Sequence, residues 1–302
     1  MNKSILVTGK NGQLGCSLQK ILIEISQNLN LSLNNFVFAS RDEIDLSKQN
    51  SISKFFSNKQ FSAIVNCAAF TSVDKAESDF KLAEKINHLA VAQLAKIAKN
   101  QNIPLIHIST DYVFQGQQSK LYIETDETNP INTYGLTKLN GEKAVISSGC
   151  NGAIIRTSWL HSEFGHNFVK TMLELGKKKD NINVVFDQIG SPTYASNLAK
   201  VVLTMLSNQR TIEVMNSQLN IYHFSDDGYC SWYDFAKAIF ELSNINCHVN
   251  PIETKNYYTH AERPLCNVMK KDKIKQHIPD LVIPHWKDAL NKCLKEIQKS
   301  KV

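Results

Sequence analysis

The segment from residue 4 to residue 22 constrains the fold of this chain more than any other part of the sequence. Residues 4–8 have the sequence SILVT, a short apolar and β-branched run that is typical of a buried strand, and GKNGQLG follows at once. Leu18, Ile21 and Leu22 then recur at helical spacing. A strand, a glycine turn and a helix open a nucleotide-binding βαβ unit. We therefore predict an α/β protein built on a Rossmann-type, doubly wound parallel sheet.

The three glycines of this turn are Gly9, Gly12 and Gly15. Their spacing is GxxGxxG, whereas the standard dinucleotide fingerprint is GxGxxG. The physical use is similar, because glycine lets the backbone turn tightly and lets amide groups approach a diphosphate. A glycine turn between a strand and a helix need not bind anything. Its place at the amino terminus, directly after a strand, favours a nucleotide site.

The end of the second predicted strand, residues 35–39, indicates which cofactor the site prefers. Dinucleotide folds usually present a carboxylate there to the adenine ribose, but this chain continues with Ser40 and Arg41. An arginine without that carboxylate suits a 2′-phosphate, so we predict NADPH, with NADH as the alternative. Asp45 and Leu46 are expected to close over the adenine. Arg41 could also be an ordinary surface residue.

Further elements follow in a βα rhythm that weakens in the last third of the chain. Within the helix predicted for residues 81–100, Leu82, Ile86, Leu89, Leu94 and Ile97 are expected to face the core. We predict an NAD(P)-binding Rossmann domain over residues 1–157, which also receives part of 182–206, and a mainly substrate-binding, smaller C-terminal lobe over 158–302. The other predicted strands are residues 63–69, 104–108, 152–156 and 182–186, and the other predicted helices are 167–177, 195–206, 231–242 and 286–298.

Composition excludes several classes of protein. The 302 residues contain 34 lysines and arginines against 28 acids, and the largest basic cluster, residues 177–179, has no interleaved aromatics, so we expect no nucleic-acid partner. The modest positive charge suits an anionic ligand. Seven dispersed cysteines without metal-ligand spacing predict reduced thiols and no metal. No apolar run is long enough for a signal peptide or a membrane span, so we expect a cytoplasmic protein.

Residues 134–138, with the sequence YGLTK, are the candidate catalytic segment. In a helix the i, i+4 spacing places Tyr134 and Lys138 on one face. A cation beside a phenol lowers its pKa from about 10 and allows it to act as general acid or base. The same spacing also occurs by chance on exposed helices. Ser109, Thr110 and Asp111 follow the strand at residues 104–108 and either hold a substrate oxygen or cap the next turn.

Taken together, six segments identify a family. They are GKNGQLG, NCAAFTSVDKAESD, STDYVFQG, YGLTK, RTSWL and GSPTYASNLA. The chain resembles, over nearly its whole length, the extended short-chain dehydrogenase/reductase superfamily, and within it most closely the dTDP-4-dehydrorhamnose reductase family. The resemblance implies reduction of the C4 ketone of dTDP-4-dehydro-β-L-rhamnose to dTDP-L-rhamnose with NADPH or NADH, the last step of dTDP-rhamnose biosynthesis.

The resemblance also implies roles for individual residues. Tyr134 would protonate the carbonyl oxygen, Lys138 would hold the nicotinamide ribose and lower the pKa of the tyrosine, and Thr110 would hydrogen-bond the alkoxide. Alternation along a strand lets one of Ser109 and Thr110 face the site, and the resemblance favours Thr110. The other residues expected to bind the cofactor are Gly9, Gly12, Gln13, Leu14, Ala68, Ala69 and Thr71, and those expected to bind substrate are Val73, Asp111, Trp159 and Arg263. Arg263 would hold the nucleotide diphosphate, or it forms a surface salt bridge.

Alternatives remain open at this point. Some relatives bind Mg²⁺ through glutamates at a dimer contact; no acidic cluster supports this here, and we expect a monomer or homodimer without metal. A non-catalytic regulatory subunit, like the beta subunit of methionine adenosyltransferase, would not need Tyr134 and Lys138. An epimerase or dehydratase acting on another sugar is a further option, although Asp111 is followed by Tyr112 and not by the glutamate expected of a dehydratase. If the chain were a sugar-binding structural protein, both the glycine turn and the YGLTK segment would have to occur by chance.

Overall fold

Six parallel strands form the central sheet in the computed structural model, which describes residues 4–25, 31–117, 120–278 and 280–299. Residues 1–3 and 300–302, the outer ends of the two predicted domain ranges, lie outside the described residues. The strand order β10-β5-β4-β3-β1-β2 grows outward from β1 in both directions, so the predicted doubly wound parallel sheet is confirmed. The strands are β1 (Ile5–Thr8), β2 (Phe36–Ala39), β3 (Ala63–Asn66), β4 (Leu105–Thr110), β5 (Gly152–Thr157) and β10 (Leu219–His223).

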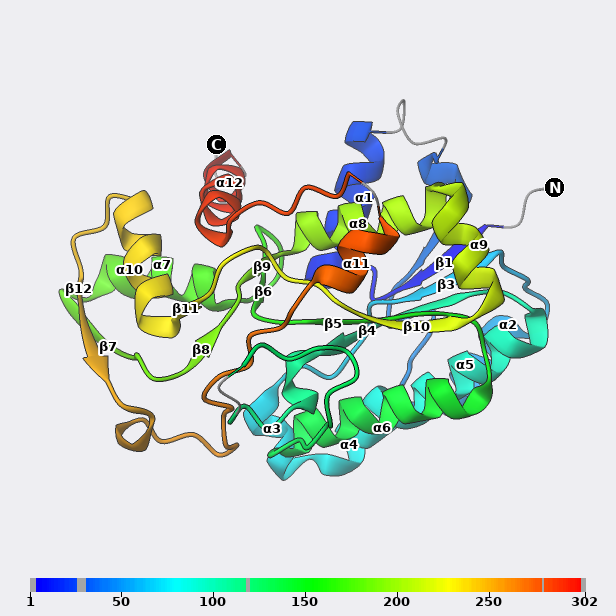
Figure 1. Ribbon diagram of the computed structural model, residues 1–302, viewed down its shortest axis with the longest axis horizontal. Coiled ribbons are helices and arrows are strands. Elements are labelled where there is room, and N and C mark those ends of the chain that lie inside the picture. Colours follow the sequence, from blue (N-terminus) through cyan, green and yellow to red (C-terminus); the bar gives the residue numbers. More distant parts are fainter. Residues whose placement is uncertain (1–3, 26–30, 118–119, 279, 300–302) are drawn as a thin grey trace.

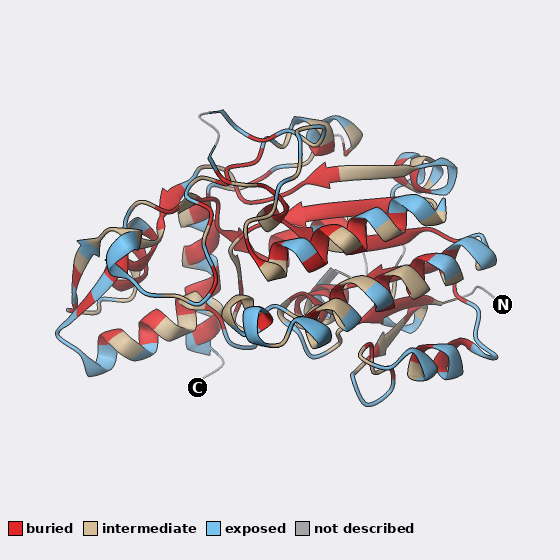
Figure 2. Ribbon diagram, turned by 90° about the horizontal axis from the view of Figure 1, so that it is seen from below, coloured by how far each residue is buried: buried red, intermediate tan, exposed pale blue. Residues whose placement is uncertain are grey.

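Helices cover both faces of the sheet (Figure 1). On one face lie α1 (Gln13–Ile25), α8 (Ala195–Ser207), α9 (Gln209–Ser217) and α11 (Asp272–His277), which share a core with side chains of β1, β3, β4 and β5. On the other face lie α2 (Gln49–Phe56), α5 (Ala90–Gln101) and α6 (Thr133–Ser148). Alternate residues of each strand enter the two cores, and buried residues fill the layers between sheet and helices (Figure 2). The strands are therefore apolar on both sides, as a parallel sheet requires.

A smaller lobe lies beyond the carboxyl ends of the strands (Figure 1). It contains α7 (Phe168–Lys178), α10 (Trp232–Leu242) and α12 (Trp286–Lys299), which pack around a core of their own with the two-stranded sheet of β7 (Asn181–Val185) and β12 (His248–Ile252). Two of its helices begin as the sequence predicts. Asn167 caps α7, and Ser231 forms a capping box with Asp234 at the start of α10.

The second half of the chain departs from the predicted pattern at several elements. The strand predicted at residues 182–186 is β7, but it pairs in the smaller lobe with β12, where no strand was predicted. Of residues 182–206, α8 packs on α1 beside the central sheet. The sequence reading missed α9 and β10, and β10 supplies the edge strand of the central sheet next to β5. The division into domains at residue 157 stays a prediction.

The helix predicted at residues 81–100 is interrupted by a π-helical turn. It runs as α4 (Phe80–Glu84), the π turn η2 (Lys85–Leu89) and α5. The wider turn shifts the phase of the helix, so the prediction that Leu89 faces the core is wrong: this side chain is 38% exposed. Asn87 is buried instead, where its amide binds both backbone groups of Phe70 and the hydroxyl of Thr137. Functional sites often carry such turns.

We predict that Leu198→Ala lowers the free energy of unfolding by about 2–5 kcal/mol, because Leu198 is fully buried between α8 and the sheet. Lys200→Ala, an exposed change on the same helix, should alter it by less than about 0.5 kcal/mol. Chemical denaturation of both variants measures the two values. Equal losses in both variants would contradict this packing.

Candidate active site

A cleft of about 670 Å³ lies at the carboxyl edge of the central sheet, between the sheet and the smaller lobe. Open α/β sheets bind their ligands at this edge. With the exception of Arg263, every residue that the sequence predicts for the site lines the cleft, including Thr110, Tyr134 and Lys138. Segments far apart in the chain are thus brought together where the motifs placed them, and the roles of these residues stay predictions.

The glycine turn forms a tight backbone cradle at one end of the cleft. Gly9 has a φ of +74°, and a Cβ on it would lie 2.9 Å from the backbone nitrogen of Ala68. A Cβ on Gly15 would lie 2.3 Å from the carbonyl oxygen of Gly9. No larger residue fits at either position without moving backbone. Because α1 begins at Gln13, the first turn of that helix presents free amide groups to the cleft, which suits the diphosphate of a dinucleotide.

Gln13 has a second function that the sequence did not indicate. Its side-chain amide donates to the carbonyl of Leu160 at 3.2 Å, and its oxygen accepts from Ser162 Oγ and Asn167 Nδ2, both at 2.9 Å. The side chain therefore fastens the segment at residues 160–167 to the glycine turn. Gln13 was predicted to face the diphosphate. In this arrangement its backbone amide can still bind a diphosphate, while its side chain is bound to the segment at residues 160–167.

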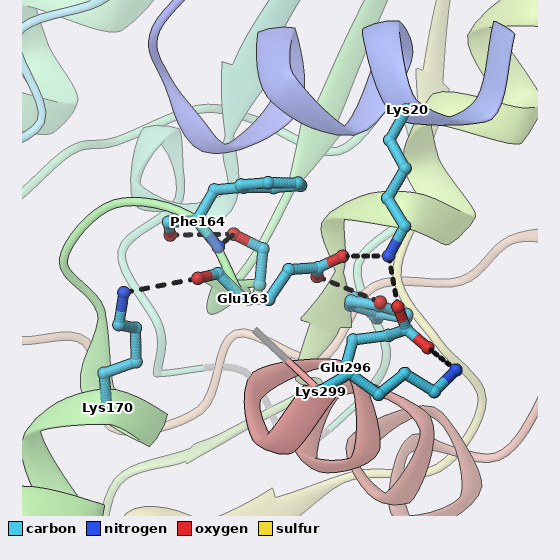
Figure 3. A network of polar contacts seen from close by, with 8 residues as sticks. Lys20, Glu163, Phe164, Lys170, Glu296 and Lys299 are labelled. Atoms are coloured by element: carbon cyan, nitrogen blue, oxygen red, sulfur yellow. Dashed lines mark hydrogen bonds and ion pairs between the residues drawn. The ribbon is translucent and has the colours of Figure 1, made fainter. Parts of the chain in front are cut away.

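An ion network holds the same segment from its other side (Figure 3). Lys20 of α1 lies between the carboxylates of Glu163, at 2.7 Å, and Glu296 of α12, at 2.5 Å. Glu163 also accepts from Tyr194 Oη at 3.0 Å, and its backbone carbonyl accepts from Lys170 Nζ at 3.2 Å. Gly165, His166 and Asn167, the next residues of the segment, line the cleft. This wall of the cleft is thus fixed by contacts with both α1 and α12.

At the adenine end, Arg41 lines the cleft with a side chain that is 73% exposed. Its Nε lies 3.6 Å from Asp45 Oδ1, and Lys48 Nζ approaches the other oxygen of Asp45 at 3.3 Å. The hydroxyl of Ser47 is the main cause that lowers the pKa of Asp45. Glu43 accepts from the backbone nitrogen of Ser40 at 2.8 Å, and its carboxylate does not line the cleft. Arg41 therefore lies at the cleft edge, where an incoming anion would compete with Asp45 for its guanidinium.

The three predicted catalytic residues converge at the centre of the cleft. Thr110 ends β4, and its hydroxyl donates to Asp111 Oδ1 at 3.0 Å, accepts from the backbone nitrogen of Tyr112 at 3.2 Å, and lies close enough to the Tyr134 phenol to influence its pKa. Tyr134 and Lys138 occupy the first turns of α6, which Asn132 caps through the backbone nitrogen of Gly135. The neighbouring Ser109 hydroxyl instead donates to Glu142, so it is Thr110 whose hydroxyl faces the phenol.

One expectation about Tyr134 is wrong. We expected Lys138 to lower the pKa of the phenol, but burial raises it to about 12, with the hydroxyl of Thr110 opposing and the carboxylate of Asp111 adding to this shift. The ammonium of Lys138 donates to the carbonyl of Ile108 at 2.6 Å, and burial lowers its own pKa to about 8. Desolvation of the phenolate is thus the largest cause of the shift, and Lys138 is not among the groups that act on it. At neutral pH Tyr134 carries its proton, as a proton donor must.

Asp111 leaves one oxygen available in the cleft. The residue is 2% exposed, and among the described residues its Oδ2 has no hydrogen-bond partner. Burial raises the pKa of this carboxyl to about 7, although several hydrogen bonds to it, first that of Thr110, act in the opposite direction. A buried carboxyl oxygen without a partner is costly. The hydroxyl of a ligand would satisfy it.

The smaller lobe contributes an aromatic wall. Trp159 has a positive φ of 45° and stacks on Trp232 with ring centroids 3.5 Å apart. A Cβ on Gly190 would lie 2.6 Å from the Trp159 ring, so glycine is needed behind it. Phe168 and Phe235 complete the wall. Trp232 was missed, because the sequence shows it as the first residue of a capped helix and gives no sign that it faces a cleft.

Arg263 is placed outside the cleft. Its Nη2 pairs with Asp74 Oδ2 at 2.5 Å, and its Nη1 donates to the carbonyl of Ala261 at 3.0 Å. Asp74 belongs to the same motif as Val73, which does line the cleft. The salt bridge that we considered as the alternative role of Arg263 is therefore present. A contact of Arg263 with the nucleotide diphosphate stays a prediction, and the position of the side chain does not support it.

The described residues offer neither a metal-binding cluster nor a helix that could cross a membrane. No group of three or more histidines, cysteines or acids there has the arrangement of a metal site. No helix in the same residues is both long and apolar enough to cross a membrane.

Comparisons with known proteins agree with this geometry. The family model described as RmlD substrate binding domain matches residues 2–299. A dTDP-4-dehydrorhamnose reductase of Aggregatibacter actinomycetemcomitans is 38% identical over 279 residues, which cover 90% of this chain and 92% of the relative. Among solved structures, a dTDP-4-dehydrorhamnose reductase from Clostridium acetobutylicum is 37% identical with a TM-score of 0.88, covering 98% and 99% of the two chains. One from Bacillus anthracis in complex with NADP is 33% identical with a TM-score of 0.88, covering 98% and 100%.

We predict that Glu163→Gln lowers the free energy of unfolding by about 1–3 kcal/mol, because it removes the charge that Lys20 and Tyr194 contact in a nearly buried site. Lys299→Gln is the matched control, since Lys299 pairs with Glu296 in the same network but is largely exposed; its effect should stay below about 0.5 kcal/mol. Urea denaturation of the two variants gives the comparison. An equal effect would show that the network adds nothing beyond a surface ion pair.

Proposed function

The chain belongs to the family described as RmlD substrate binding domain, and on that premise we propose how its cleft performs a reduction. The protein is an NADPH-dependent nucleotide-sugar oxidoreductase, a dTDP-4-dehydrorhamnose reductase, that converts the C4 ketone of dTDP-4-dehydro-L-rhamnose into the hydroxyl of dTDP-L-rhamnose. The single observation that carries the mechanism is the convergence of Thr110, Tyr134 and Lys138 in one cleft at the carboxyl edge of the sheet.

The residues present fit a dinucleotide. Gly9 and Gly12 would hold the diphosphate at the start of α1, where a side chain on Gly9 would clash with Ala68. Ala68, Ala69 and Thr71 would lie along the ribose and nicotinamide, because small residues leave that floor of the cleft open. A volume of about 670 Å³ lies in the range of cofactor and ligand clefts. Bound NADPH supplies the hydride that the C4 carbon receives.

The chain itself manages the proton and the developing charge. As the carbonyl oxygen gains negative charge, the phenol of Tyr134 donates its proton to that oxygen, and the hydroxyl of Thr110 hydrogen-bonds it. The phenolate that remains is stabilised by the ammonium of Lys138, one helical turn away on α6. The phenol forms a stronger hydrogen bond with an alkoxide oxygen than with the oxygen of the ground-state ketone. This hydrogen bond therefore strengthens as the reaction proceeds.

Two groups at the cleft are suited to the sugar. The free Oδ2 of Asp111 would accept a hydrogen bond from a sugar hydroxyl next to the reacting carbon. Trp159, supported by Trp232 behind it, would pack against the apolar face of the ring. These contacts orient the ketone toward Tyr134, and orientation of this kind contributes substantially to catalysis.

The remaining assignments concern the setting of the reaction. We propose that the protein works in the cytoplasm, where reduced thiols and a nucleotide-sugar substrate would be found, as a monomer or homodimer without a metal. All seven cysteines are free thiols in the structure, which supports a reducing setting.

Tyr134→Phe should lower kcat by on the order of 10²–10⁴, because it removes the proton donor and keeps the ring. The assay mixes protein with NADPH and dTDP-4-keto-6-deoxy-L-hexose, freshly made by an epimerase, and follows the absorbance of reduced nicotinamide. Tyr258→Phe, at a side chain that is largely exposed, is the control and should keep full activity. Wild-type protein that binds NADPH and never consumes it would favour the regulatory-subunit alternative.

Arg41→Ala should weaken NADPH binding about tenfold, the value of one exposed charge-assisted hydrogen bond, and leave NADH binding unchanged. Lys48→Ala is a closely matched control: Lys48 has the same exposure and contacts the same Asp45, but it does not line the cleft. Fluorescence titration of both cofactors gives the dissociation constants. An equal effect of Arg41→Ala on NADPH and NADH would remove the 2′-phosphate assignment.

A further inference from the structure

A row of buried polar side chains crosses the central sheet beneath the catalytic residues. It lies on the face covered by α5 and α6, at the carboxyl ends of the strands, where apolar packing would be expected. On its first half, Thr8 Oγ1 donates to Asn66 Oδ1 at 2.6 Å, and Asn66 Nδ2 lies 3.0 Å from His107 Nδ1. Burial and the charge of Lys138 hold the pKa of His107 well below its usual value, so this half of the row is neutral.

Glu142 is the centre of the other half. Arg156 of β5 donates to both oxygens of this carboxylate. Its Nε lies 3.0 Å from Oε1 and 3.2 Å from Oε2, and its Nη2 lies 2.7 Å from Oε2. The hydroxyl of Ser109 donates to Oε1 of the same carboxylate at 2.5 Å. Glu142 is 1% exposed, and Arg156 is further held against the ring of Phe114. The carboxylate therefore has a fixed place in the fold.

The position of Glu142 along α6 connects it with the reaction. Tyr134, Lys138 and Glu142 follow one another at intervals of four residues, which places all three on one face of the helix. Lys138 is 2% exposed, and its ammonium donates to the backbone carbonyl of Ile108. A buried cation with a neutral partner is costly unless an anion stands nearby. Glu142 is the anion on its own helix face.

We propose that Glu142, held by Arg156 and Ser109, is a positioning residue for this reduction: it fixes the helix face that carries Lys138 and keeps the buried ammonium charged. This inference rests on the proposed function, because it assigns to Lys138 the task of holding the cofactor ribose and stabilising the phenolate. Glu142 does not line the cleft and acts through Lys138. Ser109 joins the same unit, which explains why two adjacent hydroxyls end β4.

The charges around Lys138 agree with this arrangement. Burial lowers the pKa of Lys138, and the negative charge of Glu142 opposes that change. From β4, His107 faces the ammonium as a neutral ring, and Asp111 lies toward the cleft. The π turn against α6 contributes the neutral amide of Asn87. At the outer start of α6, Glu77 is bound to Thr133 and Asp74 to Arg263. Among these groups Glu142 is the one that raises the pKa of Lys138.

The test measures how NADPH binding depends on pH, through the fluorescence of Trp159 and Trp232 in the cleft of the full-length protein. In the wild type the dissociation constant should rise above a pH of about 8, where Lys138 loses its proton. Glu142→Gln removes the carboxylate charge, so the midpoint of that rise should fall by about one pH unit. Glu142→Asp restores the charge and should return the midpoint toward the wild-type value.

Ser109→Ala is the matched control, because it removes a hydrogen bond to the same carboxylate without changing any charge. Its midpoint should equal that of the wild type. If Glu142 has only a structural part, Glu142→Gln and Ser109→Ala will share the wild-type midpoint, and the proposal is overturned. Asp111 is present in every variant, so its own titration does not alter the comparison.

If Glu142→Gln does not fold, as judged by circular dichroism, the comparison is made in the Arg156→Met background, where no buried guanidinium is left without its anion. The double variant Arg156→Met/Glu142→Gln should then have a lower midpoint than Arg156→Met; equal midpoints overturn the proposal. The turnover assay distinguishes a failure of the proposed reaction from a failure of the role proposed for Glu142. A wild type that shows the expected binding profile and leaves the dTDP-ketosugar unreduced would refute the proposed reaction while supporting the part played by Glu142.

Discussion

The close contact of α6 with its neighbours is the constraint on which the site depends. Two glycines permit it: a Cβ on Gly135 would lie 2.2 Å from the carbonyl oxygen of Tyr112, and one on Gly141 would lie 2.2 Å from that of Asn87. The helix thus approaches the 3-10 turn at residues 111–113 and the π turn more closely than side chains would allow. This packing buries Lys138 and partly covers Tyr134, and the pKa values of both groups depart from their ordinary values.

The raised pKa of Tyr134 follows from that packing and has a chemical consequence. A phenol with a raised pKa is a weak acid, and it holds its proton until a strongly basic oxygen forms beside it. An alkoxide developing at a ketone is such an oxygen, so proton transfer accompanies the arrival of the hydride. Lys138 then matters most after the proton has left, when a phenolate remains in a site without water. Its charge is therefore worth preserving, and Glu142 is the anion that the fold provides.

The sequence predicts features that depend on neighbours along the chain and misses those that depend on distant ones. The strand before Gly9, the starts of the helices near Asn167 and Ser231, and the spacing of Tyr134 and Lys138 are local, and each was found where predicted. The π turn was missed because periodicity assumes a constant helix phase. β10 and β12 were missed because each is ordered by pairing with a strand far away in the chain. The predicted direction of the Tyr134 pKa shift was wrong because sequence spacing reveals a neighbouring charge but not the depth of burial.

The wall of the cleft shows how a residue can belong to a site without touching its ligand. The segment at residues 160–167 is held on one side by Gln13 of the glycine turn and on the other by Lys20 and Glu296 through Glu163 (Figure 3). Glu296 lies on α12, which packs in the smaller lobe and contributes no residue to the cleft lining. The last helix is therefore joined through Lys20 to α1 and through Glu163 to the segment that lines the cleft where the dinucleotide would lie.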